Sequence, residues 1–233
     1  MRGDDEAVSL SIIIPSRNES NLRACVSAIQ AAGETCNIIV VWDDWALSVL
    51  WHREYGDGWF VPGIQPFSWP RNVNLGIMSA GEDDVVIMGD DALLKTPLGL
   101  SKMRSAMAAR PHLGVLAASS NGVGNGNQRP AASAMLGQVR PEPRMLCFIT
   151  VMIPRAVINA VGLLDQRFNS YACADDDYSL RVRKAGYTLG VFDGCLVDHE
   201  SLPSTFRAPG MDSSLEHGRR MFLEKWGVSN DEA

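Results

Sequence analysis

Residues 83–91 read DDVVIMGDD and contain the pattern that decides the fold. Val85 to Met88 is a short, mostly β-branched apolar run, which is typical of a buried strand. Asp90 and Asp91 come almost directly after it. Because ligands of open α/β sheets bind outside the carboxyl ends of the strands, we expect both carboxylates to face a ligand crevice.

Two further acidic clusters extend this pattern along the chain. Asp43 and Asp44 follow a second apolar run, Ile38–Trp42, and Asp175–Asp177 opens a helical pattern. A crevice walled by aspartates would repel a nucleotide diphosphate unless a divalent cation lay between them. The three clusters therefore predict a metal-dependent nucleotide site.

Strand and helix signals alternate along the chain, which predicts an α/β fold with a mostly parallel central sheet flanked by helices. The predicted strands are Val8–Ile14 (ended by Pro15), Ile38–Trp42, Val85–Met88, His112–Ala118, Phe148–Ile153 and Leu189–Val197. Helices are predicted from Ser20 to Gly33, from Pro154 to Gly162, over Tyr178–Ala185 up to Gly186, and from Ser213 through Trp226 up to Gly227.

The length of 233 residues favours one domain over residues 1–233, with a C-terminal helix at about 213–226. Residues 119–144, rich in Gly, Asn and Pro, predict a flexible loop of the kind that often serves as a lid or binding element. The tryptophans between Trp45 and Trp69 suit either a platform for a sugar or base, or a core between strands.

Charge and cysteine usage exclude several classes. The formal charge of −6, from 21 basic and 27 acidic residues, gives no general basic field, so nucleic acid is an unlikely partner. The five cysteines are odd in number and form no C-x-x-C pair, which predicts reduced thiols and a cytoplasmic location. No apolar stretch approaches the ~20 residues of a transmembrane helix.

Seven segments resemble, in order, the signatures of family 2 glycosyltransferases with the GT-A fold. They are SIIIPSRNESNLRACVSAI, VVWDD, SWPRNVNLGIMSA, DDVVIMGDDALL, MIPRAVINAVGLLDQRF, ADDDYSLRVRKAGY and LVDHES, and the closing FLEKWG is similar to a tail of many members. The resemblance spans nearly the whole chain. It implies a metal-dependent enzyme that moves a sugar from a nucleotide diphosphate, most readily UDP, to an acceptor hydroxyl on a glycan, a protein or a small molecule.

The same resemblance implies a donor site. Pro15, Ser16 and Arg17 would enclose the nucleotide, and Asp44 would accept a hydrogen bond from the base or ribose, although Trp45 replaces the usual glycine after it. Arg71 is either a diphosphate contact or a solvated residue at a helix start. Asn74 matches the family's asparagine in this segment.

Metal and catalytic roles follow from three other motifs. Gly89 stands where the family often has its first acid, so Asp90 would lie near the ribose and Asp91 would coordinate Mn²⁺ or Mg²⁺ together with His199. Asp175 would remove the proton of the acceptor hydroxyl in a single displacement with inversion, and Ala174 replaces the acid that usually precedes it.

Two alternatives from other classes stay open. A nucleotidyltransferase also uses aspartates and a divalent ion, but its early loop is usually rich in glycine and lysine, and PSRNES has neither. A non-catalytic carbohydrate- or nucleotide-binding relative would keep the fold without the chemistry, which the joint presence of Asp91, Asp175 and His199 argues against.

Overall fold

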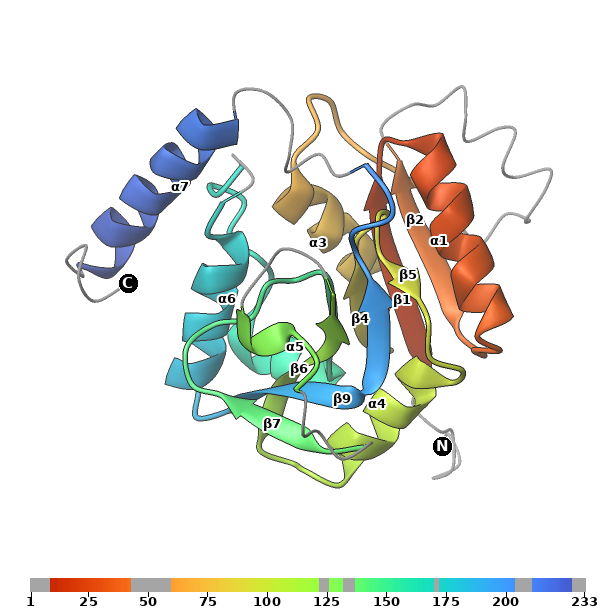
Figure 1. Cartoon of the computed structure of the whole chain (residues 1–233). Coiled ribbons are helices and arrows are strands. Elements are labelled where there is room, and N and C mark those ends of the chain that lie inside the picture. Colours follow the sequence, from red (N-terminus) through yellow and green to blue (C-terminus); the bar gives the residue numbers. More distant parts are fainter. Residues whose placement is uncertain are drawn as a thin grey trace, which may run out of the picture.

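The computed structural model describes residues 9–42, 60–121, 126–131, 137–169, 172–203 and 211–227. Its strands form one sheet in the order β3-β2-β1-β4-β8-β6-β9-β5, with β7 paired to β9 (Figure 1). The strands are β1 Leu10–Ser16, β2 Asn37–Trp42, β3 Phe60–Pro62, β4 Asp84–Met88, β5 Leu93–Leu94, β6 Leu113–Ser120, β7 Val139–Glu142, β8 Thr150–Ile153 and β9 Thr188–Asp198. The helices are α1 Glu19–Ala31, α3 Trp69–Ser79, α4 Gly99–Ala108, α5 Arg155–Val161, α6 Ala174–Lys184, α7 Met211–Trp226 and the short 3₁₀ helix η1 Gly126–Gln128.

The sheet is mixed, with most strands running in one direction. The strands β1, β2, β3 and β4 are mutually parallel, and β8 is antiparallel to both β4 and β6. Because β9 is parallel to β6 while β5 and β7 oppose β9, six described strands run one way and three the other. The predicted α/β class with a mostly parallel central sheet is confirmed.

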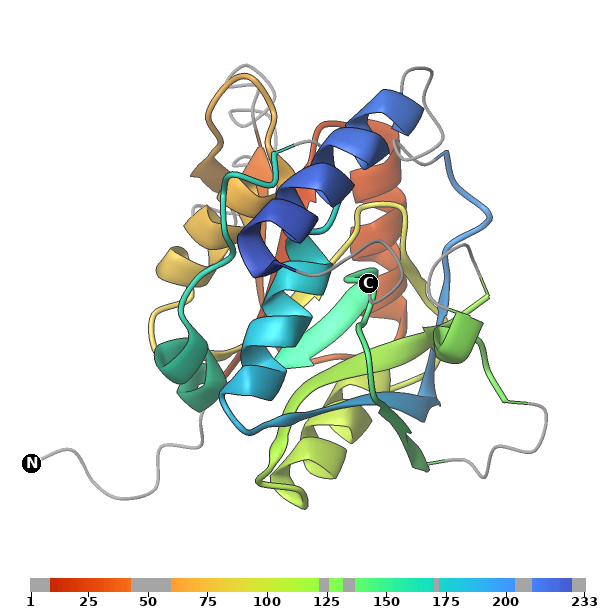
Figure 2. The same ribbon diagram turned by 90° about the vertical axis from the view of Figure 1, so that its left-hand side faces the viewer.

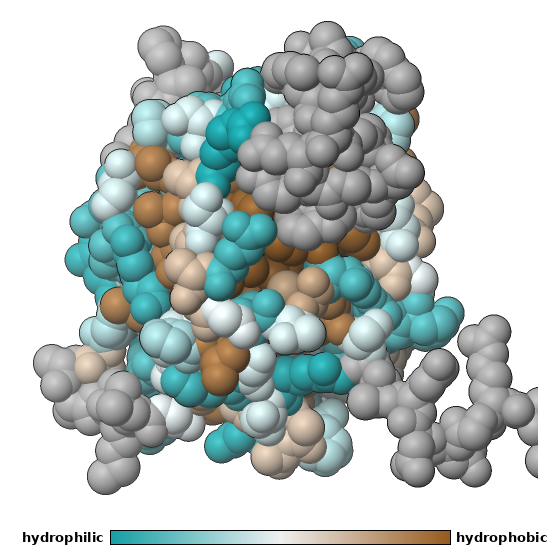
Figure 3. Space-filling view, turned by 90° about the vertical axis from the view of Figure 1, so that its right-hand side faces the viewer, coloured by the Kyte–Doolittle hydropathy of each residue, from teal (hydrophilic) through white to brown (hydrophobic). Residues whose placement is uncertain are grey.

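Helices cover both faces of the sheet. Alternate residues of β1 point to opposite faces, so Ile12 and Ile14 contribute to the core under α1 and α4, and Ile13 to the core under α3, α5 and α6. Helix α1 buries Leu22, Cys25, Val26 and Ile29 on its inner side. On this side of the molecule, Figure 3 shows hydrophilic and hydrophobic residues interspersed, with a hydrophobic area near the centre of the view. The arrangement is a sheet between two helical layers.

Helix α3 lies close against the first strand at Gly76. A Cβ atom at this position would lie 2.3 Å from Cγ2 of Ile13, whose side chain is fully buried. Only glycine therefore allows the helix this approach to the sheet.

Among the predicted element boundaries that differ from the structure, three have a local physical reason. Strand β1 continues through Pro15 to Ser16, because pairing with β4 ends at Ile13 and Pro15 has a ladder partner only in β2. Pro154 is the N-cap of α5 and not its first residue. Helix α1 begins at Glu19, one residue before the predicted start at Ser20, because the Asn18 side chain caps it by accepting the backbone N–H of Asn21.

The predicted loop at 119–144 contains ordered structure. Strand β6 extends to Ser120, and β7 lies at the end of the segment, paired with β9. Between them, the side-chain amide of Gln128 exchanges two hydrogen bonds with the backbone of Cys147. These contacts join residues distant in sequence, which is why composition alone indicates only a loop.

The C-terminal helix predicted at about 213–226 is α7, which begins two residues earlier and includes Ser213. The glycines at which helices are predicted to stop, Gly33, Gly162, Gly186 and Gly227, all have positive φ angles. Within the described residues, no helix has the length and apolar character needed to cross a membrane.

Candidate active site

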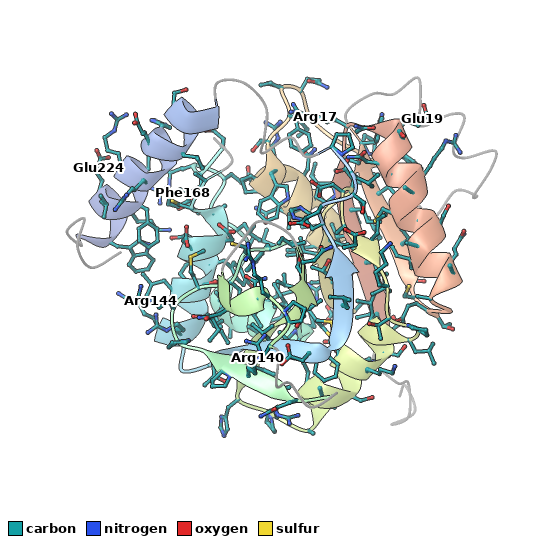
Figure 4. The ribbon with its side chains drawn as sticks, in the orientation of Figure 1. Arg17, Glu19, Arg140, Arg144, Phe168 and Glu224 are labelled. Carbon is teal, nitrogen blue, oxygen red and sulfur yellow. The ribbon has the colours of Figure 1, made fainter. Side chains whose placement is uncertain are left out.

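The carboxyl ends of the parallel strands meet at one edge of the sheet, the upper edge in Figures 1 and 4, where Arg17 lies. Strand β1 ends there at Ser16, β4 ends just before Gly89, and β9 ends just before His199. The antiparallel strand β8 starts at the same edge. The topology thus brings several of the polar residues singled out in the sequence to one place.

Asp91 and His199 form a close pair at this edge. Oδ1 of Asp91 lies 3.2 Å from Nε2 of His199, and both side chains are nearly buried, with 11% and 13% of their surfaces exposed. Gly89 leaves room for this carboxylate, because a Cβ there would lie 2.8 Å from Asp91 Oδ1. The glycine that departs from the family pattern therefore accommodates the acid two residues on.

The Asp91–His199 pair fits a divalent cation. Neighbouring ligands of an octahedral ion with bonds of ~2.1 Å lie about 3 Å apart, close to the observed separation. A carboxylate with an imidazole suits Mn²⁺ better than an all-oxygen set would. Among the described residues, no group of three His, Cys, Asp or Glu side chains forms a complete metal cage. Two protein ligands would leave the remaining positions to oxygens of a ligand and water.

His199 is oriented through its backbone by Asn121, which follows β6. The side-chain oxygen of Asn121 accepts the backbone N–H of His199 at 2.9 Å, and its amide donates to Asp198 at 3.1 Å. Asp198 also accepts hydrogen bonds from the backbone and hydroxyl of Ser201. The end of β9 is fixed in this way.

Asp90 faces the end of β1. Oγ of Ser16 donates to Asp90 at 2.5 Å, and further hydrogen bonds come from the Asn21 side chain and the Arg17 backbone N–H. Burial raises the pKa of Asp90 to about 6, the Asp91 charge contributes to the rise, and these hydrogen bonds oppose it. The donors that hold Asp90 are thus neutral, and its charge is unfavourable at neutral pH.

Asp175 reaches the same edge through a short chain of backbone contacts. Its carboxylate accepts the backbone N–H of Phe148. The carbonyl of the following residue, Ile149, accepts the backbone N–H of Gly89 at 2.8 Å. Burial raises the pKa of Asp175. The carboxylate is therefore placed beside the segment that carries Asp90 and Asp91.

Asp176 and Asp177 differ although they are adjacent. Burial, followed by the Asp175 charge, raises the pKa of Asp176 to about 7. Asp177 is fully buried and receives a 2.9 Å hydrogen bond from Arg181, one turn later in α6. Burial thus disfavours the negative charge of Asp176, whereas Arg181 compensates that of Asp177.

Arg71 and Asn74 engage the protein itself. The Arg71 guanidinium donates to the carbonyls of Ile64 and Pro66, which holds the loop before α3. Asn74 is buried, and its amide exchanges two hydrogen bonds with the backbone of Leu164 at 2.8 and 2.9 Å. These contacts give both residues a structural task in this conformation.

The remaining predicted donor residues lie around the end of β1. Pro15 pairs opposite Val41 inside the sheet, and the Arg17 guanidinium lies over the Phe67 ring, 5.1 Å from its centroid. An open recess of about 710 Å³ adjoins them, lined by Arg17, Asn18, Glu19, Ser20 and Arg23. Asp44, with Asp43 and Trp45, lies outside the described residues.

Two site residues escape the sequence interpretation. Asn121 follows a strand end, as Asp90 does, so its position after β6 was the available signal. Asn21 lies on α1, where it contacts Asp90 and also donates to the carbonyl of Pro203 at 2.8 Å. Only the folded chain shows that α1 supplies a residue to this edge.

Comparison with protein families finds no family whose pattern matches this chain, and no curated protein sequence matches it. Solved structures do match. A structure of GalNAc-T7 with UDP, GalNAc and Mn²⁺ aligns with a TM-score of 0.68 at 11% identity, over 96% of this chain and 49% of that chain. The chain thus spans about half of that protein's length.

A structure of residues 1–349 of S. aureus TarS aligns with a TM-score of 0.62 at 15% identity, over 96% of this chain and 76% of that one. The same piece of TarS in complex with UDP aligns with a TM-score of 0.57 at 16% identity. Both proteins are glycosyltransferases of the GT-A type, and at these identities the likeness concerns architecture alone. The chain has the GT-A fold.

Proposed function

We propose that the protein is a divalent-metal-dependent glycosyltransferase of the family 2 type that transfers a sugar from a nucleotide diphosphate, with UDP the favoured nucleotide, to an acceptor hydroxyl. The observation that carries this proposal is the gathering of Asp90, Asp91, His199 and Asp175 at the carboxyl edge of a GT-A sheet. The UDP found in two of the matching structures supports the choice of nucleotide.

In this proposal, Asp91 and His199 hold a divalent ion, with Mn²⁺ preferred over Mg²⁺ because of the imidazole. When bound, the ion supplies positive charge that stabilises the departing diphosphate. Asp90, held by Ser16 and Asn21, accepts hydrogen bonds from the ribose. Pro15, Ser16, Arg17 and Asp44 surround the nucleotide, while Arg71 and Asn74 fix α3 and its loop.

Asp175 acts as the general base. The acceptor oxygen forms a bond to the anomeric carbon as the bond between that carbon and the diphosphate breaks, the electron pair leaves with the diphosphate, and the hydroxyl proton passes to the Asp175 carboxylate. One displacement inverts the anomeric configuration. The raised pKa of Asp175 makes the carboxylate a stronger proton acceptor than a solvent-exposed aspartate.

The test is UDP release from UDP-GalNAc, UDP-GlcNAc and UDP-glucose, with Mn²⁺ or with EDTA and with water as the default acceptor. We expect one donor to release UDP only with metal, and proton NMR to show a β-sugar as the first product of an α-linked donor. Asp83→Asn is the matched control, because Asp83 lies at the opposite end of β4. An α-sugar as first product would overturn inversion, and absence of metal-dependent UDP binding to the wild-type protein would overturn the proposal as a whole.

A further inference from the structure

The fully buried acid Asp177 joins the C-terminal helix to the helix that carries Asp175. Oδ1 of Asp177 lies 2.6 Å from Nζ of Lys225 and accepts the indole N–H of Trp226 at 3.0 Å, while Oδ2 accepts from Arg181. A buried carboxylate without such donors would be strongly destabilising. The contact between α6 and α7 is therefore a specific, compensated cluster of charges.

Lys225 and Arg181 extend this cluster to neighbouring segments. Lys225 also lies 2.8 Å from Oδ2 of Asp165, and its ammonium lies 5.5 Å from the centre of the Phe168 ring. Arg181 donates to the carbonyls of Val161 and Leu163, each at 2.9 Å. Figure 4 shows Phe168 beside α7 and Glu224 on the outer side of that helix. The charges thus tie α5, α6 and α7 together.

A second contact between α7 and the approach to α6 lies two turns earlier, at Gly218. A Cβ atom there would lie 2.6 Å from Cβ and 2.9 Å from the carbonyl oxygen of Ala172. The helix therefore lies directly on the backbone that leads into α6. Figures 1 and 2 show α7 beside α6. The two contacts fall three residues before and two residues after Asp175.

We propose that α7 is a clamp that positions the Asp175 carboxylate, with Lys225 and Trp226 as positioning residues and Asp177 as their anchor. The role in transfer rests on the proposed function, but the mechanical part does not. The hydrogen bonds that Asp175 receives come from backbone N–H groups, those at the start of its own helix and that of Phe148. Its position thus depends on that of the first turn of α6, which α7 holds from both sides.

The mechanical part is tested by hydrogen exchange of the metal-free, full-length protein. Lys225→Met and Trp226→Phe should raise the exchange rate of amides in residues 172–180 by about tenfold. Each variant lacks one of the contacts to Asp177, so local opening of this segment costs less free energy. Arg220→Met is the matched control on the same helix, where Arg220 makes surface contacts with Glu224 and His217. Wild-type exchange of residues 172–180 in both variants would overturn the clamp.

The functional part is tested by the kinetics of metal-dependent UDP release from the best UDP-sugar. Lys225→Met and Trp226→Phe should lower kcat by about tenfold or more and leave the KM for the donor unchanged, since misplacement of a reacting group by ~1 Å costs ~10²-fold. Lys225→Arg should restore most of kcat, which a general loss of folding would not allow. If Asp175→Asn abolishes turnover while both α7 variants keep wild-type kcat, the clamp fails and the proposed function survives.

Turnover by Asp175→Asn at the wild-type rate separates the two proposals in the other direction. It would remove the general base from the proposed function, while the exchange experiment would still decide whether α7 holds the start of α6.

Discussion

The two ends of β4 carry the same pair of acids in opposite electrostatic surroundings. At its start, burial alone would raise the pKa of Asp83, but hydrogen bonds from Ser11, Ser9 and Asn37 and the charge of Arg155 lower it. Beyond its end, burial raises the pKa of Asp90 to about 6, with a further contribution from the adjacent Asp91. Asp83 thus receives several hydrogen bonds and the favourable charge of Arg155, whereas the donors that hold Asp90 are neutral.

We propose that the difference separates acids that hold the fold together from acids that bind a ligand. Asp83 joins β1, β2 and β4, and Asp84 accepts the backbone N–H at the start of α5. The same division recurs in the third cluster, where Arg181 and Lys225 compensate Asp177 while burial raises the pKa of Asp175 and of Asp176. Carboxylates with raised pKa at a sheet's carboxyl edge are a physical sign of a functional site.

The largest effect is expected for Asp175→Asn, because an amide cannot accept the proton of the acceptor. Turnover should fall by ~10²–10⁴-fold while UDP binding in the presence of Mn²⁺ keeps its wild-type affinity. Turnover and calorimetric titration with UDP measure the two quantities. Asp83→Asn, which removes a compensated acid, should leave both unchanged, and equal losses of turnover in the two variants would break the comparison.

A smaller effect is expected for Asn121→Ala. The amide orients His199 through its backbone and also holds Asp198, so its loss should weaken Mn²⁺ binding by about 10–100-fold, as for other groups that orient metal ligands. Electron paramagnetic resonance of free Mn²⁺ measures this affinity. Asn127→Ala is the control, because Asn127 contacts Glu142. An unchanged Mn²⁺ affinity in Asn121→Ala would count against His199 as a ligand.

The smallest effects should show the comparison most sharply as opposite pH dependences of stability. Between about pH 4 and 6, the folded protein binds more protons at Asp90 than the unfolded chain does. The contribution of Asp90 to the free energy of unfolding therefore falls as pH rises through this window. The free energy of unfolding of Asp90→Asn should therefore exceed that of the wild type by about 1–3 kcal/mol at pH 7.5 with EDTA, and should equal it at pH 4.

Asp83 has the opposite sign, because its pKa is lowered in the folded state. Its contribution is present above the unfolded pKa of ~3.9 and is lost as pH falls through the folded value, so Asp83→Asn should destabilise the protein at pH 7.5 and less at pH 3. Urea unfolding of the three proteins across this range gives the free energies. Parallel pH profiles of the two variants would contradict the proposed division of the acids.

Much of the fold follows from local sequence, because β1, β2 and β4 are short, mostly apolar runs and four helices end at glycines with positive φ. Other elements depend on distant partners. Helix α4 begins after Leu98, which has a left-handed backbone conformation, and the Glu34 carboxylate accepts the N–H groups of Leu100 and Ser101 at its start. No residue near α4 in the sequence indicates such a cap.

In the site, too, some residues can be predicted from local sequence, and the roles of others depend on distant contacts. Asp90, Asp91 and His199 follow strands, so the alternation of apolar runs and acids predicts that they meet, and the distance between Asp91 and His199 agrees. The task of Asn74 depends on Leu164, ninety residues later, and that of Asn21 on Pro203. Residue type at a motif position shows that a group can bind a ligand, and only tertiary contacts show whether the protein already uses it.

The most direct measurement is calorimetric titration of UDP into the protein with Mn²⁺ and with EDTA, for the wild type, Asp91→Ala and Asp83→Asn. Wild type and Asp83→Asn should bind UDP only with Mn²⁺, and Asp91→Ala should lose this metal-dependent binding. Equal binding of UDP to the wild type with and without metal, or wild-type binding by Asp91→Ala, would contradict the assignment of a metal site to the carboxyl edge.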